Sequence, residues 1–165
     1  MENKIIGKAH VFGDNIDTDQ IYPGRFLELV KPHEIAKHCM VGAKEDFLDN
    51  FTKGDLIIGG TNFGCGSSRE HAVITLKSAG VGAVVAKSFA RIFYRNAFNL
   101  GLPLVACKDL DKLDIANHTV TLDLEKSTLT DDVTGVSVLC EPISEYAMEL
   151  LTFGGIKNLI KERYK

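Results

Sequence analysis

The sequence predicts an α/β fold, because three buried strands alternate with two helices in its central part. Apolar runs at residues 56–60, 81–86 and 102–106 have the length and composition of buried strands. Helical segments are predicted between them, over residues 68–79 and 88–99. The order strand–helix–strand–helix–strand is typical of right-handed crossovers in a parallel sheet.

Glycine, serine and proline residues indicate where these helices and strands begin and end. Gly80 and Gly101 follow the two predicted helices and are suited to end them, and Ser88 is suited to cap the start of the second. Before the central part, a short strand at residues 10–13 leads into a polar loop in which Pro23 and Gly24 mark turns. Pro32 favours the start of a helix over residues 32–40.

The C-terminal part combines a hairpin with short helices. Residues 118–124 alternate polar and apolar side chains, as a half-exposed strand does, and residues 136–139 would pair with them. Residues 145–151 and 156–163 predict two short helices. Because the sequence contains no repeat and no clear linker, we interpret residues 1–165 as a single domain.

Composition excludes several classes of protein. Hydrophobic residues make up 45% and charged residues 25%, as in soluble globular proteins. The net charge of −3 and the lack of a Lys/Arg stripe argue against a nucleic-acid partner. The longest apolar run, residues 81–86, is too short to span a membrane, and the N-terminus lacks the apolar region of a signal peptide. We therefore expect a cytoplasmic protein without a membrane partner.

The four cysteines do not have the spacing of a metal site. Cys39, Cys65, Cys107 and Cys140 are scattered and include no C-x-x-C pair. We expect reduced, structural thiols, and no metal or iron–sulfur cluster bound by this chain alone.

Residues 64–72, with the sequence GCGSSREHA, are the most informative stretch. Residues 64–69 are here called the serine loop. Their glycines let the backbone approach a ligand closely, and the helix that follows offers its free N–H groups and its positive end to the same ligand. Arg69 can grip a carboxylate with two parallel hydrogen bonds. A serine beside it could exchange a proton with a bound acid.

Two other interpretations of this stretch need no catalysis. Ser67 and Glu70 have the S-x-x-E spacing of a capping box, which could simply start the helix. Phosphate binding is also conceivable, but the stretch lacks the lysine of G-x-x-x-x-G-K-[ST] and does not match G-x-G-x-x-G.

Three ordered blocks resemble the small, swivelling domain of the aconitase superfamily. GCGSSREHA resembles its serine loop, DTDQI (17–21) with PGRFL (23–27) its N-terminal active-site loop, and AKSFARIFYRN (86–96) a third block. The resemblance covers nearly the whole chain and is greatest to the stand-alone small subunits of the 3-isopropylmalate dehydratase branch. It implies a single swivelling β/β/α domain with a C-terminal hairpin and short helices.

The resemblance also implies a function. The chain would be the small subunit of a hydro-lyase that isomerises 2-isopropylmalate to 3-isopropylmalate by dehydration and rehydration in leucine biosynthesis. Its partners would be a large subunit, without which it is inactive, and a small hydroxy-dicarboxylic acid. A [4Fe–4S] cluster, held by three cysteines of the large subunit, would act as Lewis acid on the leaving hydroxyl.

Matched position by position, the resemblance assigns roles to single residues. Ser67 is expected to be the catalytic base that removes and returns the proton. The expected substrate-binding residues are Ser68, Arg69, Thr18 and Asp19, and the specificity loop comprises Arg25, Glu28, Leu29 and Val30. Tyr22 replaces a serine of the single-chain aconitases, and Val73 a proline of many small subunits.

Alternatives to this function remain. Homoaconitate or 2,3-dimethylmalate could be the substrate, although the negative charge of Glu28 is unfavourable for the third carboxylate of homoaconitate. A chain of another class would be a non-catalytic module that binds a small acid and regulates a partner.

Further polar residues have alternative interpretations. Lys87, Arg91 and Arg95 could form a cationic wall for a dicarboxylic acid, but a solvated helix face is the simpler explanation. Asp17 and Asp19 could hold a metal, although D-x-D is common in loops. His71 could shuttle protons, or it could be structural. Cys65 is also more simply interpreted as structural, as a small residue that fills a tight space.

Overall fold

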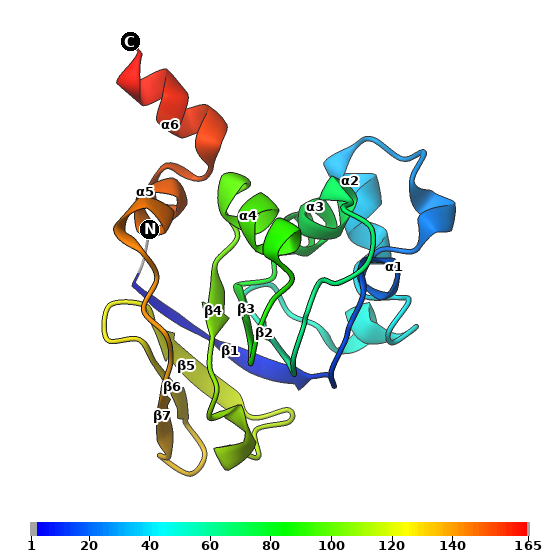
Figure 1. Ribbon diagram of the computed structural model, residues 1–165. Helices are drawn as coiled ribbons and strands as arrows, with labels where there is room; N and C mark the ends of the chain where they lie inside the picture. The colour runs from blue at the N-terminus through cyan, green and yellow to red at the C-terminus, as the bar shows by residue number, and fades with distance from the viewer. Residues whose placement is uncertain (1–2, 165) are drawn as a thin grey trace.

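The computed structural model describes residues 3–164, whose centre is a seven-stranded sheet (Figure 1). Its strand order is β4-β3-β2-β1-β5-β6-β7. The first four positions in that order form a parallel half and the last three an antiparallel half, and β1 joins the two. The strands are β1 (Lys4–Val11), β2 (Leu56–Gly59), β3 (Ala83–Ala86), β4 (Leu104–Ala106), β5 (Thr119–Asp123), β6 (Thr128–Asp131) and β7 (Ser137–Leu139).

Strands β2, β3 and β4 are apolar throughout because both of their faces are covered. Ile57 of β2 packs into a core with Leu76 and Phe93, which come from the two crossover helices. Its neighbours Leu56 and Ile58 face the opposite side, where the antiparallel half contributes a second core. The α/β class predicted from these runs is confirmed. The crossover helices are α3 (Glu70–Ala79) and α4 (Arg91–Asn99), and two helices near the C-terminus are α5 (Glu145–Phe153) and α6 (Ile156–Arg163).

The long connection from β1 to β2 contains only short helical turns. The helix predicted over residues 32–40 is shorter than expected: one α-helical turn is followed by a 3₁₀ turn, and Met40 then takes a positive φ of 60°. Asp17 starts an unpredicted turn through a capping box with Gln20. These elements are α1 (Thr18–Ile21), η1 (Gly24–Phe26), α2 (Pro32–Ile35), η2 (Ala36–His38) and η3 (Phe47–Asn50), and a further 3₁₀ turn, η4 (Leu110–Lys112), follows β4.

Both crossover helices begin later than predicted. The N-cap of α3 is Arg69, which makes no capping hydrogen bond with its side chain, so Ser67 and Glu70 do not form the capping box. The Oγ of Ser88 accepts a hydrogen bond from the Asn62 N–H at 2.8 Å, so the predicted Ser88 cap is also wrong. The end of α3 is as expected, because Gly80 adopts a left-handed conformation there with φ 95°.

The predicted hairpin between residues 118–124 and 136–139 is wrong in its pairing. Strand β6 lies between the two segments, so β5, β6 and β7 form a three-stranded meander. The sequence hides β6 because Leu129 is the only large apolar residue among its four. Both predicted C-terminal helices are present, and α6 extends away from the sheet in Figure 1. Within residues 3–164, no helix is long and apolar enough to cross a membrane.

Candidate active site

The serine loop connects β2 to α3 and is shaped by two glycines. Gly64 and Gly66 have φ values of 86° and 98°, which side chains other than glycine rarely adopt. A Cβ atom on Gly64 would lie 2.2 Å from Cγ of Phe93, so the loop packs directly on α4. Ser67 and Ser68 are exposed beyond these glycines. The loop therefore presents two hydroxyl groups to solvent from a constrained backbone.

The N-terminal loop, residues 14–27, is hydrogen-bonded to the serine loop through residues 16–19. The Gly64 N–H donates to the Ile16 carbonyl at 2.7 Å, and the Thr18 N–H donates to the Cys65 carbonyl at 2.8 Å. The Thr18 hydroxyl donates to the Ser67 carbonyl at 2.9 Å, and Thr18 is buried. Two segments that the sequence predicts as parts of one site are thus in contact.

Asp19 and Arg69 connect the same two loops by charge. Oδ1 of Asp19 accepts hydrogen bonds from the Gly24 N–H at 2.8 Å and from Nη1 of Arg69 at 3.1 Å. These donors, the Gly24 N–H first and the Arg69 guanidinium second, hold the pKa of Asp19 below its usual range. The Arg69 side chain is 24% exposed. Its orientation is fixed by the carboxylate, while part of the side chain remains exposed.

A hollow of 220 Å³, here called the serine-loop hollow, lies between the serine loop and the first turns of α4. Three predicted substrate-binding residues, Thr18, Ser68 and Arg69, line it. Ser67 does not line it but directly precedes Ser68 on its rim. The volume suits a small organic acid, and the lining includes two arginines and no carboxylate. The remaining lining residues are Gly64, Gly66, Ala90, Arg91, Ile92, Phe93 and Asn96.

The predicted specificity loop lies outside this lining. The Arg25 guanidinium stacks 4.7 Å from the ring centroid of Phe26, and Glu28 and Val30 are exposed. The Leu29 carbonyl is 3.0 Å from Nε2 of His71. The loop is therefore held against His71 of α3 and does not line the hollow.

Tyr22 and His71 have structural positions beneath this loop. The Tyr22 hydroxyl donates to the Phe26 carbonyl at 2.6 Å, and its ring stacks on His71 with centroids 5.4 Å apart. Because the His71 ring is engaged by Tyr22 and by the Leu29 carbonyl, the geometry favours the structural interpretation of His71.

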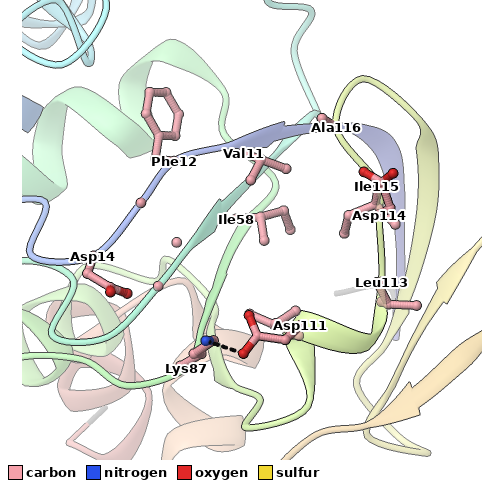
Figure 2. Close-up of a pocket in the computed structure, with 14 residues that line it drawn as sticks. Val11, Phe12, Asp14, Ile58, Lys87, Asp111, Leu113, Asp114, Ile115 and Ala116 are labelled. Carbon is pink, nitrogen blue, oxygen red and sulfur yellow. Dashed lines mark hydrogen bonds and ion pairs between the residues drawn. The ribbon is translucent and has the colours of Figure 1, made fainter.

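Lys87, Arg91 and Arg95 do not form one wall. Lys87 pairs with Asp111 at 2.5 Å on the border of a separate, larger hollow of 350 Å³ (Figure 2). That hollow lies under residues 110–116 and is lined by none of the predicted site residues. Arg91 lines the serine-loop hollow, whereas Arg95 does not. Asn96 also lines the serine-loop hollow but was not predicted as a site residue, although it lies in the third block.

The other polar candidates are engaged elsewhere. Asp17 caps α1 by accepting a hydrogen bond from the Gln20 N–H at 2.8 Å, while Asp19 binds Gly24 and Arg69, so the two carboxylates have different partners. Burial raises the pKa of the Cys39 thiol to about 12. Cys65 is half-buried in the serine loop and, like the other three cysteines, is free.

Comparison with known proteins gives consistent matches. The family of aconitase C-terminal domains matches residues 6–109. The chain is 49% identical to the 3-isopropylmalate dehydratase small subunit 1 of Methanopyrus kandleri, over 98% of this chain and 95% of that one. It is 47% identical to a methanogen homoaconitase small subunit of Methanocaldococcus jannaschii, over 96% and 92%.

A solved structure has the same fold. The crystal structure of a 3-isopropylmalate dehydratase from Methanocaldococcus jannaschii superposes with a TM-score of 0.93 at 45% identity, covering 97% of this chain and 95% of that one. The swivelling-domain fold implied by the three sequence blocks is thereby confirmed.

Proposed function

This chain belongs to the family of aconitase C-terminal domains, and from that premise we propose that it is the small subunit of a 3-isopropylmalate dehydratase. This hydro-lyase isomerises 2-isopropylmalate to 3-isopropylmalate in leucine biosynthesis, in complex with a large subunit. One observation carries the proposal beyond similarity: the Thr18 hydroxyl binds the Ser67 carbonyl, so the N-terminal and serine loops form one site. The identity of 49% to such a subunit, over 98% of this chain, also supports the proposal.

The [4Fe–4S] cluster of the reaction belongs, in this proposal, to the large subunit. The thiols described here do not fit a cluster: Cys39 is in the core beside the helices, Cys65 is in the serine loop, and Cys107 and Cys140 are in the second core. The bound cluster would supply a Lewis acid for the leaving hydroxyl. Free thiols persist in a reducing compartment, which supports a cytoplasmic location.

Arg69, Ser68 and Asp19 would bind and orient the substrate. The partly exposed Arg69 guanidinium is suited to a carboxylate of the acid, and the Ser68 hydroxyl can donate to the same group. Asp19 keeps Arg69 in place through the hydrogen bond from Nη1 to Oδ1. The carboxylate would thus be positioned before the chemistry begins.

Ser67 would move the proton. In the first half-reaction, its alkoxide takes a proton from the carbon next to a carboxylate and becomes a neutral hydroxyl, while the hydroxyl on the neighbouring carbon leaves with its bonding electron pair as hydroxide. In the second, the Ser67 hydroxyl gives its proton to the other carbon and becomes an alkoxide again, while hydroxide adds where the proton was removed. The N-terminal end of α3 and Arg69 are the nearby positive groups that favour an alkoxide. Within residues 3–164, the Ser67 hydroxyl makes no hydrogen bond that would compete.

The substrate is the finer part of this proposal. The similarity to a homoaconitase small subunit is nearly as great as that to a dehydratase small subunit, so identity alone does not select isopropylmalate. Glu28 is exposed in the predicted specificity loop, and its negative charge would be unfavourable for a third carboxylate, which favours a dicarboxylic acid. 2,3-Dimethylmalate would fit the same charge pattern.

The test is to co-produce the chain with its large subunit, reconstitute the cluster anaerobically and measure turnover. We expect activity with 2-isopropylmalate, less with 2,3-dimethylmalate and little with homoaconitate, and none from this chain alone. Turnover of homoaconitate as the best substrate would overturn the choice of acid. A complex that binds acids without turning over any of them would indicate the regulatory module instead.

A further inference from the structure

The first turns of α4 form a wall of the serine-loop hollow that the proposed function leaves without a role. Arg91 and Asn96 line the hollow from this helix, and Ser68 and Arg69 line it from the serine loop. Resting on the proposed function, we infer that Arg91 binds the second carboxylate of the dicarboxylic substrate, with the Asn96 amide beside it, while Arg69 binds the first.

The charge of Arg91 is not compensated within the described part of the chain. Arg69 shares its charge with Asp19, and Lys87 is paired with Asp111. Between residues 3 and 164, the Arg91 guanidinium has neither a hydrogen bond nor an ion pair. No Asp or Glu lines the hollow either, so its lining carries an excess of positive charge. Such a lining favours an acid with two negative charges over one with a single charge.

Backbone hydrogen bonds fix α4 against the serine loop. The Phe63 N–H donates to the Ser88 carbonyl, and the Ala90 N–H donates to the Phe63 carbonyl, both at 3.0 Å. Gly64 then packs against the Phe93 ring with no room for a side chain. The backbone at Arg91 is therefore held in a fixed position relative to the serine loop, which carries Ser68 and Arg69. Rigid coupling lets two arginines act as a clamp of set spacing.

Arg95 provides a matched control for Arg91. It lies one turn further along the same helix, is also exposed, carries the same charge and does not line the hollow. Replacing either arginine by glutamine removes one positive charge from α4. Only the replacement at position 91 removes a charge from the hollow. The comparison therefore distinguishes substrate binding from a general electrostatic effect of α4 and from a contact of its surface with the large subunit.

The experiment compares the wild-type complex with Arg91→Gln and Arg95→Gln complexes of equal cluster content. We expect Arg91→Gln to raise KM for the diacid by about 10-fold or more, because a charged pair with a carboxylate is lost, and Arg95→Gln to stay within about 2-fold. Calorimetry adds a readout that needs no turnover. Isopropylsuccinate, an unreactive diacid, should bind Arg91→Gln at least about 10-fold more weakly, while binding of the monoacid 4-methylpentanoate should change little.

Each failure has a separate meaning. If the wild-type complex turns over isopropylmalate but Arg91→Gln and Arg95→Gln behave alike in both readouts, Arg91 does not bind the substrate and only this inference is lost. If diacid and monoacid lose the same affinity in Arg91→Gln, Arg91 does not recognise a second carboxylate. A wild-type complex that neither turns over nor binds the diacid would remove the proposed function and this inference together.

Discussion

Asp19 and Arg69, 50 residues apart in the chain, share a hydrogen bond of 3.1 Å that connects the two loops of the candidate active site. The same Oδ1 atom of Asp19 accepts the Gly24 N–H, which holds the carboxylate in place. The guanidinium is consequently oriented before any substrate arrives. Arrangements of this kind reduce the ordering that binding would otherwise require.

Arg69→Lys should impair the complex although the charge is kept. An ammonium group cannot bind Asp19 and a substrate carboxylate with the planar geometry of a guanidinium. We expect kcat/KM to fall by about 10-fold or more, which corresponds to about 1.4 kcal/mol of transition-state binding. Steady-state kinetics of the reconstituted complex measure this, and unchanged kinetics would remove Arg69 from the site.

Asp19→Asn should have an effect on stability that depends on pH. The amide can still accept the Gly24 N–H, but it loses the charge that faces Arg69. Because the pKa of Asp19 is lowered in the folded chain, its carboxylate stabilises the fold above the unfolded pKa of about 3.9, and this contribution disappears as pH falls through the folded pKa.

Thermal melts of wild type and Asp19→Asn should therefore differ slightly at pH 7 and converge as pH falls through the lowered folded pKa of Asp19. The difference should be small, because the Asp19 side chain is 66% exposed and solvent screens its charge. A difference that grows as pH falls would contradict the lowered pKa. At pH 7 the turnover of the complex should fall although the melting temperature changes only slightly, because Arg69 loses the partner that orients it.

Ser67→Ala should separate catalysis from helix capping. The N-cap of α3 is Arg69, so loss of the Ser67 hydroxyl should change the free energy of unfolding by less than about 0.5 kcal/mol, as for an ordinary surface substitution. Turnover should fall by about 10²–10⁴-fold if Ser67 is the base. Urea unfolding of the chain and single-turnover kinetics of the complex measure the two effects. A stable variant that keeps more than about a tenth of wild-type kcat would contradict the role of base.

Gly64→Ala should disrupt the serine loop. Its φ of 86° disfavours a side chain, and the added Cβ would overlap the Phe93 ring. Gly135→Ala is the matched control, because Gly135 has a φ of 79° and open space around it. We expect about 1 kcal/mol of destabilisation for the control and about 1–3 kcal/mol more for Gly64→Ala, from the overlap. Equal losses in urea unfolding would show that Phe93 yields without cost.

Strands β2, β3 and β4 and the place of the serine loop were predictable from local sequence patterns, whereas β1 extends over residues 4–11 and was predicted only at residues 10–13. Apolar runs identify β2, β3 and β4 because both faces of a parallel sheet are buried, and Gly80 ends α3 because glycine adopts the left-handed conformation easily. The resemblance of three ordered blocks indicated the family. Each of these signals lies within a short stretch of the chain.

Which polar residues come into contact depends on the tertiary structure. Ser67 has the spacing of a helix cap, yet the hydrogen bonds of the serine loop with Ile16 and Thr18 hold it away from that role. Arg91 and Arg95 look equivalent on one helix, but the packing of Gly64 on Phe93 brings only the first of them to the hollow. Such contacts join segments far apart in sequence, and their geometry depends on backbone pairing and close packing that no local pattern encodes.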